Sequence, residues 1–460
     1  MKRVLLPLLF LILSSSVAMG LAHVSSPSVA SWEVRPSGNG ASQEQLIVRF
    51  NRPMNRGSVE ERFTISPDLE GSISWTEGTL FFTPNEPFPR GKAVKFSLKE
   101  GAQDQYGRAL STSQDFELSL PSQRFVFLNT DGQLSSADLD GTVASLTKRR
   151  RIVDFAVENE VTVWYLHQPD DATSTELWKL DLSTKTEQQL ALSLSGRLTQ
   201  LSVGRNSDAY LVATPLDPTQ GVPTPYVIDL ATGQTNKVAL GGVENTLASL
   251  SLASDRSTLI ASDVDAVQHL RSVADEKLVS LTKLTLYRGS DTAGRKLVFE
   301  DVVPDKNYAS EVVVYDGVQR RIDLGAANGS MPTLSPNGAR VAYSYQDMSP
   351  LNQLEVAAGQ SLVDSLALPV YGLRVQSIDA PTPAWQKSEK GTSYELPKFS
   401  PDGRILAVET FSEAQLGDLR SLREFGEPNK PVYSRIRLID ATTGEFLEHD
   451  FLGRELQWLP

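Results

Sequence analysis

Residues 399–411 read FSPDGRILAVETF, a pattern of turn and strand residues that recurs along the chain. A phenylalanine leads into a Ser-Pro-Asp-Gly turn, and a run of alternating apolar residues follows. Asp-Gly between two β-prone runs is a strong hairpin signal, because the turn needs backbone conformations with positive φ. The stretch therefore predicts a β-hairpin that turns at Asp402 and Gly403.

The same outline recurs along the chain. A close copy stands at residues 334–344 (LSPNGARVAYS), and weaker copies stand at 252–262 (LASDRSTLIAS) and 203–213 (VGRNSDAYLVA). Each copy is followed by a strand, a tight turn and an outer strand. Four-stranded units of about forty to fifty residues are typical of β-propeller blades. The repeats predict a propeller of six or seven blades, with seven favoured: 150–192, 197–240, 246–281, 282–326, 329–370, 395–452 and one blade shared by the two ends of the propeller.

The shared blade follows from two incomplete stretches. Residues 455–460 (ELQWLP) look like the innermost strand of a blade, yet the chain stops there. Residues 124–148 supply later strands without a clean first strand. Pairing the two closes the ring and removes two exposed sheet edges. With the intact Ser-Pro-Asp-Gly turn at 400–403, this repeat set resembles the TolB-type propellers.

The stretch before the propeller predicts a separate β-domain. Short strands bounded by turn residues fill residues 32–118, which is typical of an immunoglobulin-type sandwich. A strand runs into a Phe-x-x-Pro-Met-Asn turn, and a Gly-x-x-x-Trp strand and a late Asp-x-x-Gly follow: Phe50, Pro53, Met54, Asn55, Gly71, Trp75, Asp104 and Gly107. This pattern resembles the bacterial Ig-like domain of SbsA-type surface proteins. The resemblance implies a surface-exposed spacer or adhesion module.

The N-terminus has the three parts of an export signal. Lys2 and Arg3 precede an apolar run at residues 4–13, and small residues follow. The alternative is an uncleaved anchor, because residues 4–22 are just long enough to span a bilayer. The prediction is thus a signal peptide or anchor at 1–22, a tether at 23–31, an SbsA-like Ig-like domain at 32–120 and a TolB-like propeller at 121–460, closed by 455–460.

Composition excludes several classes of protein. The net charge of −12 becomes −14 once the two positive charges of Lys2 and Arg3 leave with a signal segment. An acidic chain of this kind is not typical of nucleic-acid binding or of binding to an anionic membrane surface. The absence of cysteine excludes disulfides, thiolate catalysis and cysteine-ligated zinc. We expect an exported periplasmic, cell-surface or extracellular monomer without membrane contact beyond its first segment.

A search for catalytic and metal-binding motifs favours a protein that is not an enzyme. No Gly-x-Ser-x-Gly sequence occurs, and the four histidines are scattered without His-Glu-x-x-His spacing. Residues 138–141 (DLDG) and 263–265 (DVD) lack the further acidic ligands of a calcium loop. The sequence therefore predicts no catalytic residue, no metal site and no cofactor.

Long insertions indicate where a partner would bind. They fall between the second and third strands of several blades, at 167–175, 214–225, 303–310, 346–352 and 412–431. Equivalent loops of every blade emerge on one face, and loops on a rigid scaffold commonly build binding sites. The predicted partner-face residues are His167, Asp170, Asp171, Asp217, Asp305, Tyr308, Asp347, Leu419 and Phe425.

Two functions compete on this basis. The favoured one is an exported binding or scaffold module that engages an envelope protein or polysaccharide through these loops. The alternative is a propeller hydrolase or lyase that acts on peptide or glycan, with carboxylates converging on a central funnel. Propellers host both roles, so fold alone cannot choose between them.

Overall fold

The structure is a computed structural model of the whole chain. It describes residues 26–36, 44–85, 88–89, 91, 93–120, 122–169, 174–192, 194, 197–204, 208–214, 223–243, 246–265, 267–273, 278–281, 286–303, 309–322, 327–347, 370–380, 382–389, 392–412 and 434–460. The predicted signal segment lies outside these residues. Internal contacts divide the chain into two compact units, Met1–Pro121 and Ser122–Pro460.

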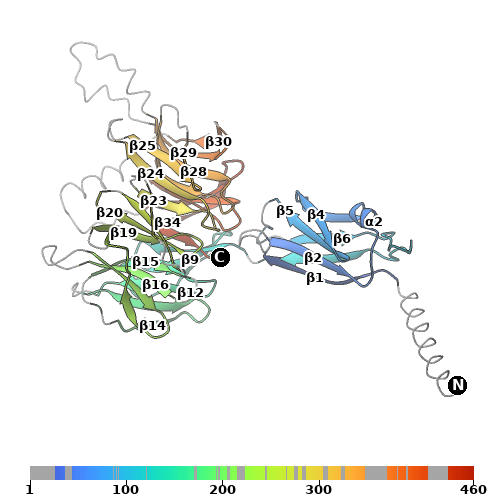
Figure 1. Cartoon of the computed structure of the whole chain (residues 1–460), viewed down its shortest axis with the longest axis horizontal. Coiled ribbons are helices and arrows are strands. Elements are labelled where there is room, and N and C mark those ends of the chain that lie inside the picture. Colours follow the sequence, from blue (N-terminus) through green and yellow to red (C-terminus); the bar gives the residue numbers. More distant parts are fainter. Residues whose placement is uncertain are drawn as a thin grey trace, which may run out of the picture. The chain divides into compact units, whose positions relative to one another are not determined.

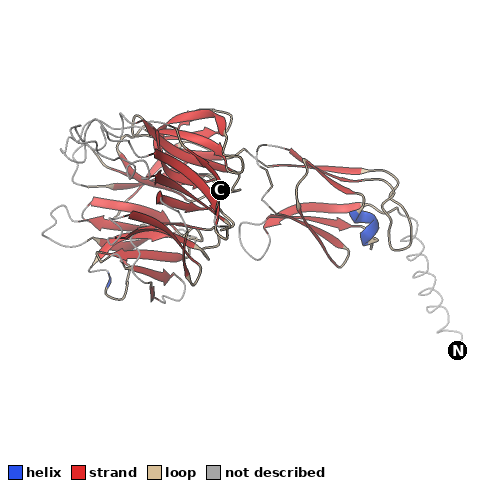
Figure 2. Ribbon diagram, turned by 90° about the horizontal axis from the view of Figure 1, so that it is seen from above, coloured by secondary structure: helices blue, strands red, loops and turns tan. Residues whose placement is uncertain are grey.

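Both units are all-β, as predicted (Figure 2). Among the described residues α2 (Arg56–Glu60) is the one α-helix, and the side chain of Asn55 caps its first turn by accepting a hydrogen bond from the Ser58 amide. None of the described helices is long and apolar enough to span a membrane.

The first unit consists of two antiparallel sheets around one core. The larger sheet has the order β1 (Val29–Pro36), β2 (Glu44–Phe50), β5 (Thr79–Pro84) and β4 (Gly71–Thr76), and the smaller has β3 (Phe63–Ser66), β6 (Ala93–Leu98) and β7 (Gln114–Ser119). Alternate residues of β5 and β6 are buried, among them Leu80, Phe82 and Phe96, because successive side chains of a strand point to opposite faces. β1 begins inside the predicted tether, so residues 29–31 extend the sheet instead of linking it.

The second unit contains five four-stranded antiparallel sheets in simple sequential order (Figure 1). Their strands are β11 (Ile152–Val157), β12 (Thr162–His167), β13 (Glu176–Asp181) and β14 (Thr186–Leu190); β15 (Arg197–Val203), β16 (Asp208–Thr214), β17 (Thr224–Asp229) and β18 (Thr235–Lys237); β19 (Leu247–Leu252), β20 (Thr258–Asp263), β21 (Gln268–Ser272) and β22 (Leu278–Ser280); β23 (Leu286–Ser290), β24 (Leu297–Val303), β25 (Ala309–Tyr315) and β26 (Gln319–Arg321); β27 (Ala327–Leu334), β28 (Arg340–Asp347), β29 (Val370–Ser377) and β30 (Pro383–Lys387). Each of these sheets is open, with its first and fourth strands at the edges.

The remaining strands form one seven-stranded sheet with the order β10-β9-β8-β34-β33-β32-β31. They are β8 (Arg124–Asn129), β9 (Leu134–Asp138), β10 (Val143–Ser145), β31 (Thr392–Phe399), β32 (Ile405–Ser412), β33 (Arg435–Asp440) and β34 (Phe446–Trp458). β34 serves two sets of neighbours, because its first half pairs with β33 and its second half pairs with β8. Glycine is required at the crossover, since a Cβ at Gly453 would collide with the ring of Phe127.

The structure corrects one predicted blade. The interval 329–370 ends one residue into β29, and the sheet instead takes its outer strands from β29 and β30. Residues 348–369 separate β28 from β29, so the outer strands of this sheet begin later than the repeat length of the other blades predicts. That stretch lies outside the described residues.

The turns that led to the fold prediction form as expected. In 400–403 the hydroxyl of Ser400 donates to Asp402 and accepts from the amide of Ile405, and Gly403 adopts a φ of 71°. Ser335 and Asn337 repeat the hydroxyl contact in the 335–338 turn. A left-handed residue closes each of these turns, which is the conformation that glycine adopts without steric cost.

Hydrophobic clusters connect each sheet of the second unit to the next. One cluster joins β11–β14 to β15–β18, and others continue through the sheets that follow. Another joins Ala407 and Leu438, from β32 and β33, to Phe125 on β8. The last joins Val126 on β8 to Phe155 on β11, so the series returns to its start. The arrangement is consistent with a β-propeller.

Candidate functional site

Six edge strands of the second unit and the second half of β34, which together we call the seven first strands, each contain an irregularity in their pairing. The pairing shifts between Ile152 and Asp154 in β11, Thr199 and Ser202 in β15, Leu247 and Ser249 in β19, Tyr287 and Gly289 in β23, Ser330 and Thr333 in β27, Glu395 and Lys398 in β31, and Arg454 and Gln457 in the second half of β34. A β-bulge leaves backbone groups without a ladder partner, and buried backbone groups require one.

At five of these strands a side chain accepts a hydrogen bond from the backbone, and in four of the five it comes from a neighbouring sheet; Glu409 and Glu455 lie in the same seven-stranded sheet. Each accepts a hydrogen bond from a backbone amide: Asp154 from Leu201 (2.6 Å), Gln200 from Leu250 (2.9 Å), Glu300 from Met331 (3.0 Å), Glu409 from Glu455 (2.6 Å) and Gln457 from Val157 (3.1 Å). Other groups bridge the two junctions that remain, with the Ser254 amide donating to Ser290 and Arg340 donating to the carbonyl of Gly403. Polar contacts therefore tie every sheet to the next.

Ionisable groups of the first strands and of β32 form a cluster, which consists of Asp154, Lys398, Glu409 and Glu455. Burial raises the pKa of Asp154 to about 6, although amide hydrogen bonds from Leu201 and Phe155 oppose the change. Burial also raises the pKa of Glu409 and lowers the pKa of Lys398. Asp154, Glu409 and Glu455 act electrostatically on Lys398 and favour its charged form.

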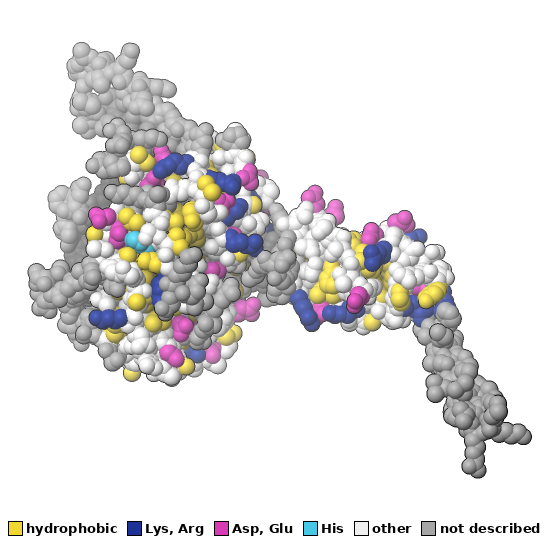
Figure 3. All heavy atoms as spheres, in the orientation of Figure 1, with side chains coloured by type: hydrophobic (Ala, Val, Ile, Leu, Met, Phe, Trp, Pro, Cys, Tyr) yellow, Lys and Arg dark blue, Asp and Glu magenta, His cyan; other side chains and the backbone are white. Residues whose placement is uncertain are grey.

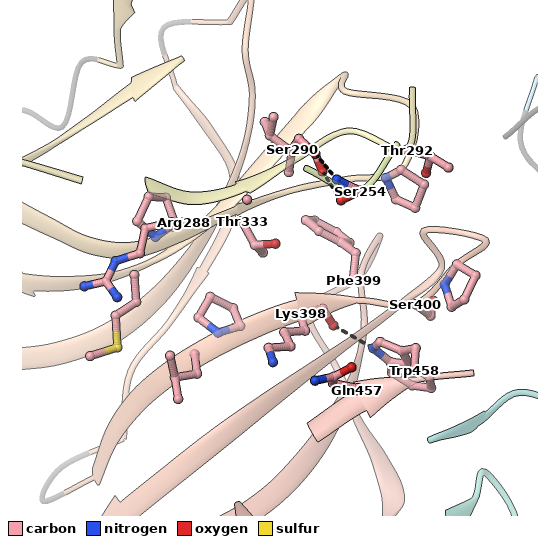
Figure 4. Close-up of a pocket in the computed structure, with 18 of the residues that line it drawn as sticks. Ser254, Arg288, Ser290, Thr292, Thr333, Lys398, Phe399, Ser400, Gln457 and Trp458 are labelled. Carbon is pink, nitrogen blue, oxygen red and sulfur yellow. Dashed lines mark hydrogen bonds between the residues drawn. The ribbon is translucent and has the colours of Figure 1, made fainter. Parts of the chain in front are cut away.

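Beside this cluster lies a pocket of about 430 Å³, which we call the central pocket. It is formed where five first strands end, and Figure 4 shows its side chains. The lining comprises Ser254, Arg288, Gly289, Ser290, Thr292, Met331, Pro332, Thr333, Leu334, Pro336, Leu396, Pro397, Lys398, Phe399, Ser400, Pro401, Gln457, Trp458 and Pro460. Proline and aromatic side chains provide apolar walls, and the two charged side chains of the lining, Arg288 and Lys398, are both cations.

The two cations differ in their partners. Arg288 is paired with Glu300, with 2.6 Å between Nη2 and Oε2. The Lys398 ammonium donates a 2.7 Å hydrogen bond to the carbonyl of Leu456. Within the described part of the chain no carboxylate lies within 4.0 Å of it. Lys398 is thus held by one backbone contact and by the field of more distant carboxylates.

Arg256 ties two sheets that are not consecutive. It stands in the turn between β19 and β20 with a φ of 54°. Its guanidinium donates to the carbonyl of Val157 at 2.9 Å and also to that of Glu158, at the end of β11. The side chain therefore links the sheet of β19–β22 directly to the sheet of β11–β14.

The predicted partner-face residues lie at the other ends of the strands. His167 ends β12 opposite the start of β11, and its Nδ1 lies 3.1 Å from an oxygen of Glu176. Asp347 ends β28 opposite the start of β27. The other predicted residues lie outside the described residues: Asp170, Asp171, Asp217, Asp305, Tyr308, Leu419 and Phe425.

Sequence reasoning missed the central pocket and its lysine. One signal could have found them, because 331–336 (MPTLSP) and 396–401 (LPKFSP) align, and Lys398 takes the place of Thr333. The described residues contain no group of three His, Asp or Glu side chains arranged to hold a metal ion.

Comparisons with known proteins give these findings. No family model matches the chain, and no curated protein matches it. Among solved structures the chain is similar to TolB from Acinetobacter baumannii, with 15% identity and a TM-score of 0.39 over 87% of this chain and 83% of that chain. It is also similar to a putative TolB from Agrobacterium tumefaciens, with 14% identity and a TM-score of 0.39 over 62% of this chain and 98% of that chain. Kuenenia stuttgartiensis hydrazine synthase has 12% identity and a TM-score of 0.41 over 66% of this chain and 87% of that chain. TM-scores of this size assign neither a family nor an activity.

Proposed function

We propose that this chain is an exported binding or scaffold protein of the cell envelope or cell surface, without catalytic activity. In this proposal an SbsA-like Ig-like domain precedes a closed, TolB-like propeller of seven blades. The export signal at residues 1–22 supports the location, and the protein acts as a monomer without a cofactor. Its partner is an envelope protein or a polysaccharide.

The ring of polar junctions supports seven blades. Seven first strands carry the bulge, and the series of hydrophobic clusters returns from β32 and β33 to β8. Pairing of β34 with β8 supports closure of the ring by the C-terminal strand. In the first unit, two sheets that share one core support the Ig-like sandwich.

The main support for the proposal is that the carboxylates near the central pocket accept hydrogen bonds from backbone amides. Asp154 accepts hydrogen bonds from the amides of Leu201 and Phe155. Glu409 accepts from the Glu455 amide and from the Ser434 hydroxyl. A carboxylate that holds backbone amides serves the scaffold, whereas acid–base chemistry needs one that faces a substrate. A rigid ring is suited to present loops to a partner.

The partner face in this proposal is the one where the second strands end. β12, β16, β24, β28 and β32 all end there and lead into the long insertions. Figure 3 shows Lys and Arg side chains interspersed with Asp and Glu on the face that it draws. Neither sign of charge dominates the described surface in that view, so the proposal does not depend on attraction by bulk charge.

A binding experiment with the full chain tests this function. Immobilised protein is exposed to envelope proteins and to envelope polysaccharides in separate experiments. A variant with Asp217, Asp305 and Asp347 changed to Ala should lose the retained partner. The matched control Thr333→Trp alters the opposite face and should keep it. Equal retention by both variants, or no saturable retention by the unchanged chain, contradicts the proposal.

A hydrolase or lyase acting on peptide or glycan is the second candidate. One observation favours it, because carboxyl groups with a raised pKa, such as Asp154 and Glu409, are suited to act as general acids. Purified protein incubated with peptide and glycan pools distinguishes the two functions. Turnover that disappears in Asp154→Asn and Glu409→Gln would replace the binding proposal with the enzymatic one.

A further inference from the structure

We propose that the central pocket binds a small ligand that has a carboxylate and an apolar group, and that the carboxylate forms an ion pair with the Lys398 ammonium. The pocket lies where the first strands end, whereas the partner face lies where they begin. This site is therefore independent of the proposed function and can be tested separately.

The first argument comes from the hydrogen bonds of Lys398. An ammonium group has three donors, and here one donates to the Leu456 carbonyl at 2.7 Å. Among the described residues no carboxylate comes within 4.0 Å, so the charge has no direct ion-pair partner. Lys398 is partly buried, and a partly buried charge without such a partner is unfavourable. A bound carboxylate would use the remaining donors and supply the missing counter-charge.

The second argument comes from the charges around the pocket. Lys398 and Arg288 are the charged residues of its lining, and both are positive. The acidic neighbours of Lys398 do not line the pocket, and Asp154 and Glu409 are already bonded to backbone amides. Arg288 is paired with Glu300, so Lys398 is the cationic side chain left for a ligand, and the acidic side chains near Lys398 lie outside the lining. This arrangement selects an anion over a cation.

The third argument concerns shape and polarity. A volume of about 430 Å³ lies within the range of small-ligand pockets, which is roughly 300–1,000 Å³. The rings of Phe399 and Trp458 form apolar walls, and the Trp458 indole nitrogen is already bonded to the carbonyl of Lys398 at 3.1 Å (Figure 4). Several prolines add apolar surface that has no amide proton to satisfy. An apolar group of one or two amino-acid residues in size suits these walls.

Two sources offer this chemistry, namely the free C-terminus of a polypeptide and a small carboxylic acid. Titration calorimetry on the full chain separates them with three probes: acetyl-Ala-Leu with a free carboxylate, acetyl-Ala-Leu amide and 4-methylpentanoate. We expect the free peptide to bind at least about tenfold more tightly than the amide, because a neutral amide can accept a hydrogen bond but supplies no counter-charge to the ammonium. A small acid that binds as tightly as the peptide identifies the second source.

Variants locate the site. Lys398→Met should weaken binding of the free carboxylate by about tenfold or more. Lys296→Met is the matched control, because Lys296 also donates a 2.7 Å hydrogen bond to a carbonyl at a sheet junction, that of Gly338, and does not line the pocket. Its affinity should be unchanged. Thr333→Trp fills the pocket and leaves Lys398 intact, so it decides the question if Lys398→Met does not fold.

Three results would overturn the proposal. The first is equal affinity for the peptide acid and its amide, a comparison that needs no variant. The second is unchanged affinity in a folded Lys398→Met or Thr333→Trp protein. The third is the absence of saturable binding of either carboxylate at millimolar concentration.

Discussion

The carboxylate of Asp154 accepts a 2.6 Å hydrogen bond from the backbone amide of Leu201, which belongs to the next sheet. This contact satisfies a bulge amide that has no ladder partner. It also places a carboxyl group in a partly buried position beside Lys398 and Glu455, where burial raises its pKa to about 6. One side chain therefore links sheet packing to the charge balance of the site.

Replacing Asp154 with Asn should change how stability depends on pH. A pKa above the ordinary value means that the favourable contribution of Asp154 is present at low pH and is lost as pH rises through about 6. Asn keeps an oxygen acceptor and carries no charge. The unfolding free energy of the variant, compared with that of the unchanged protein, should therefore be on the order of 1–2 kcal/mol higher at pH 8 than at pH 4. Denaturant unfolding of both proteins at both pH values measures this difference.

Asp140→Asn is a control with the opposite sign. The amide of Thr142 donates to Asp140 and lowers the pKa of that carboxyl, so its favourable contribution is present at high pH. Compared with the unchanged protein, this variant should be destabilised more at pH 8 than at pH 4. If Asp154→Asn changes stability equally at both pH values, the burial of its charge is not the cause.

Arg256 should stabilise the second unit through its two carbonyl contacts. Arg256→Met leaves the carbonyls of Val157 and Glu158 without these donors, which should cost about 1–3 kcal/mol. Arg256→Lys should recover part of the loss, because a single ammonium replaces the forked guanidinium. Urea unfolding of the three proteins measures both effects.

Arg320→Met is the matched control for Arg256. Arg320 pairs with Asp316 and Asp379 on the surface, and half of its side chain is exposed. Exposed pairs contribute little, so its loss should change stability by less than about 1 kcal/mol. Equal losses in Arg256→Met and Arg320→Met would show that the contact across sheets has no special weight.

The first unit should fold without the second. Its two sheets share one core that includes Leu46, Val59, Leu80 and Phe96, all fully buried. A protein comprising residues 26–120 should melt in one cooperative transition, detected by circular dichroism. A protein with Phe96→Ala should lose about 3–5 kcal/mol, because a large cavity opens in that core. Absence of a cooperative transition in the isolated unit would mean that its stability depends on the second unit.

Much of the strand pattern could be predicted from the sequence. Asp402 and Gly403 specify their turn locally, and residues 405–412 form the strand that follows it. The expected alternation of buried and exposed residues is not observed, because residues 406–411 are all buried. The missing first strand beside residues 124–148 was predictable too, because β34 supplies a complementary fragment at the other end of the unit. These features depend on neighbours in sequence or on unpaired strand edges.

The central pocket could not be predicted in the same way. Asp154, Lys398 and Glu409 lie on three different strands, and each looks like an ordinary polar position in an alternating run. Their proximity depends on the bulges, which change register without a marked sequence pattern. The sequence instead predicted a binding site in the long insertions, which lie at the opposite ends of these sheets.

The C-terminal strand makes several contacts that the second unit needs. Leu456 and Leu459 are buried, and the Trp458 ring meets Phe125 edge to face with 5.3 Å between centroids. Gln457 accepts from the Val157 amide and donates to the carbonyl of Phe155, so it joins the shared sheet to β11. We expect these contacts to determine the stability of the whole second unit.

Deleting residues 455–460 tests that expectation. Removing large core side chains costs about 2–5 kcal/mol each, against a total stability of roughly 5–15 kcal/mol. The deletion also leaves β8 as an unpaired edge, which promotes aggregation. The shortened protein should therefore melt far earlier or precipitate in a thermal scan. Removing the exposed Pro460 alone serves as the control and should leave the midpoint unchanged. Should the protein ending at Arg454 melt at the original temperature, the pairing of β34 with β8 would contribute nothing to stability, and closure of the propeller by the C-terminal strand would have to be abandoned.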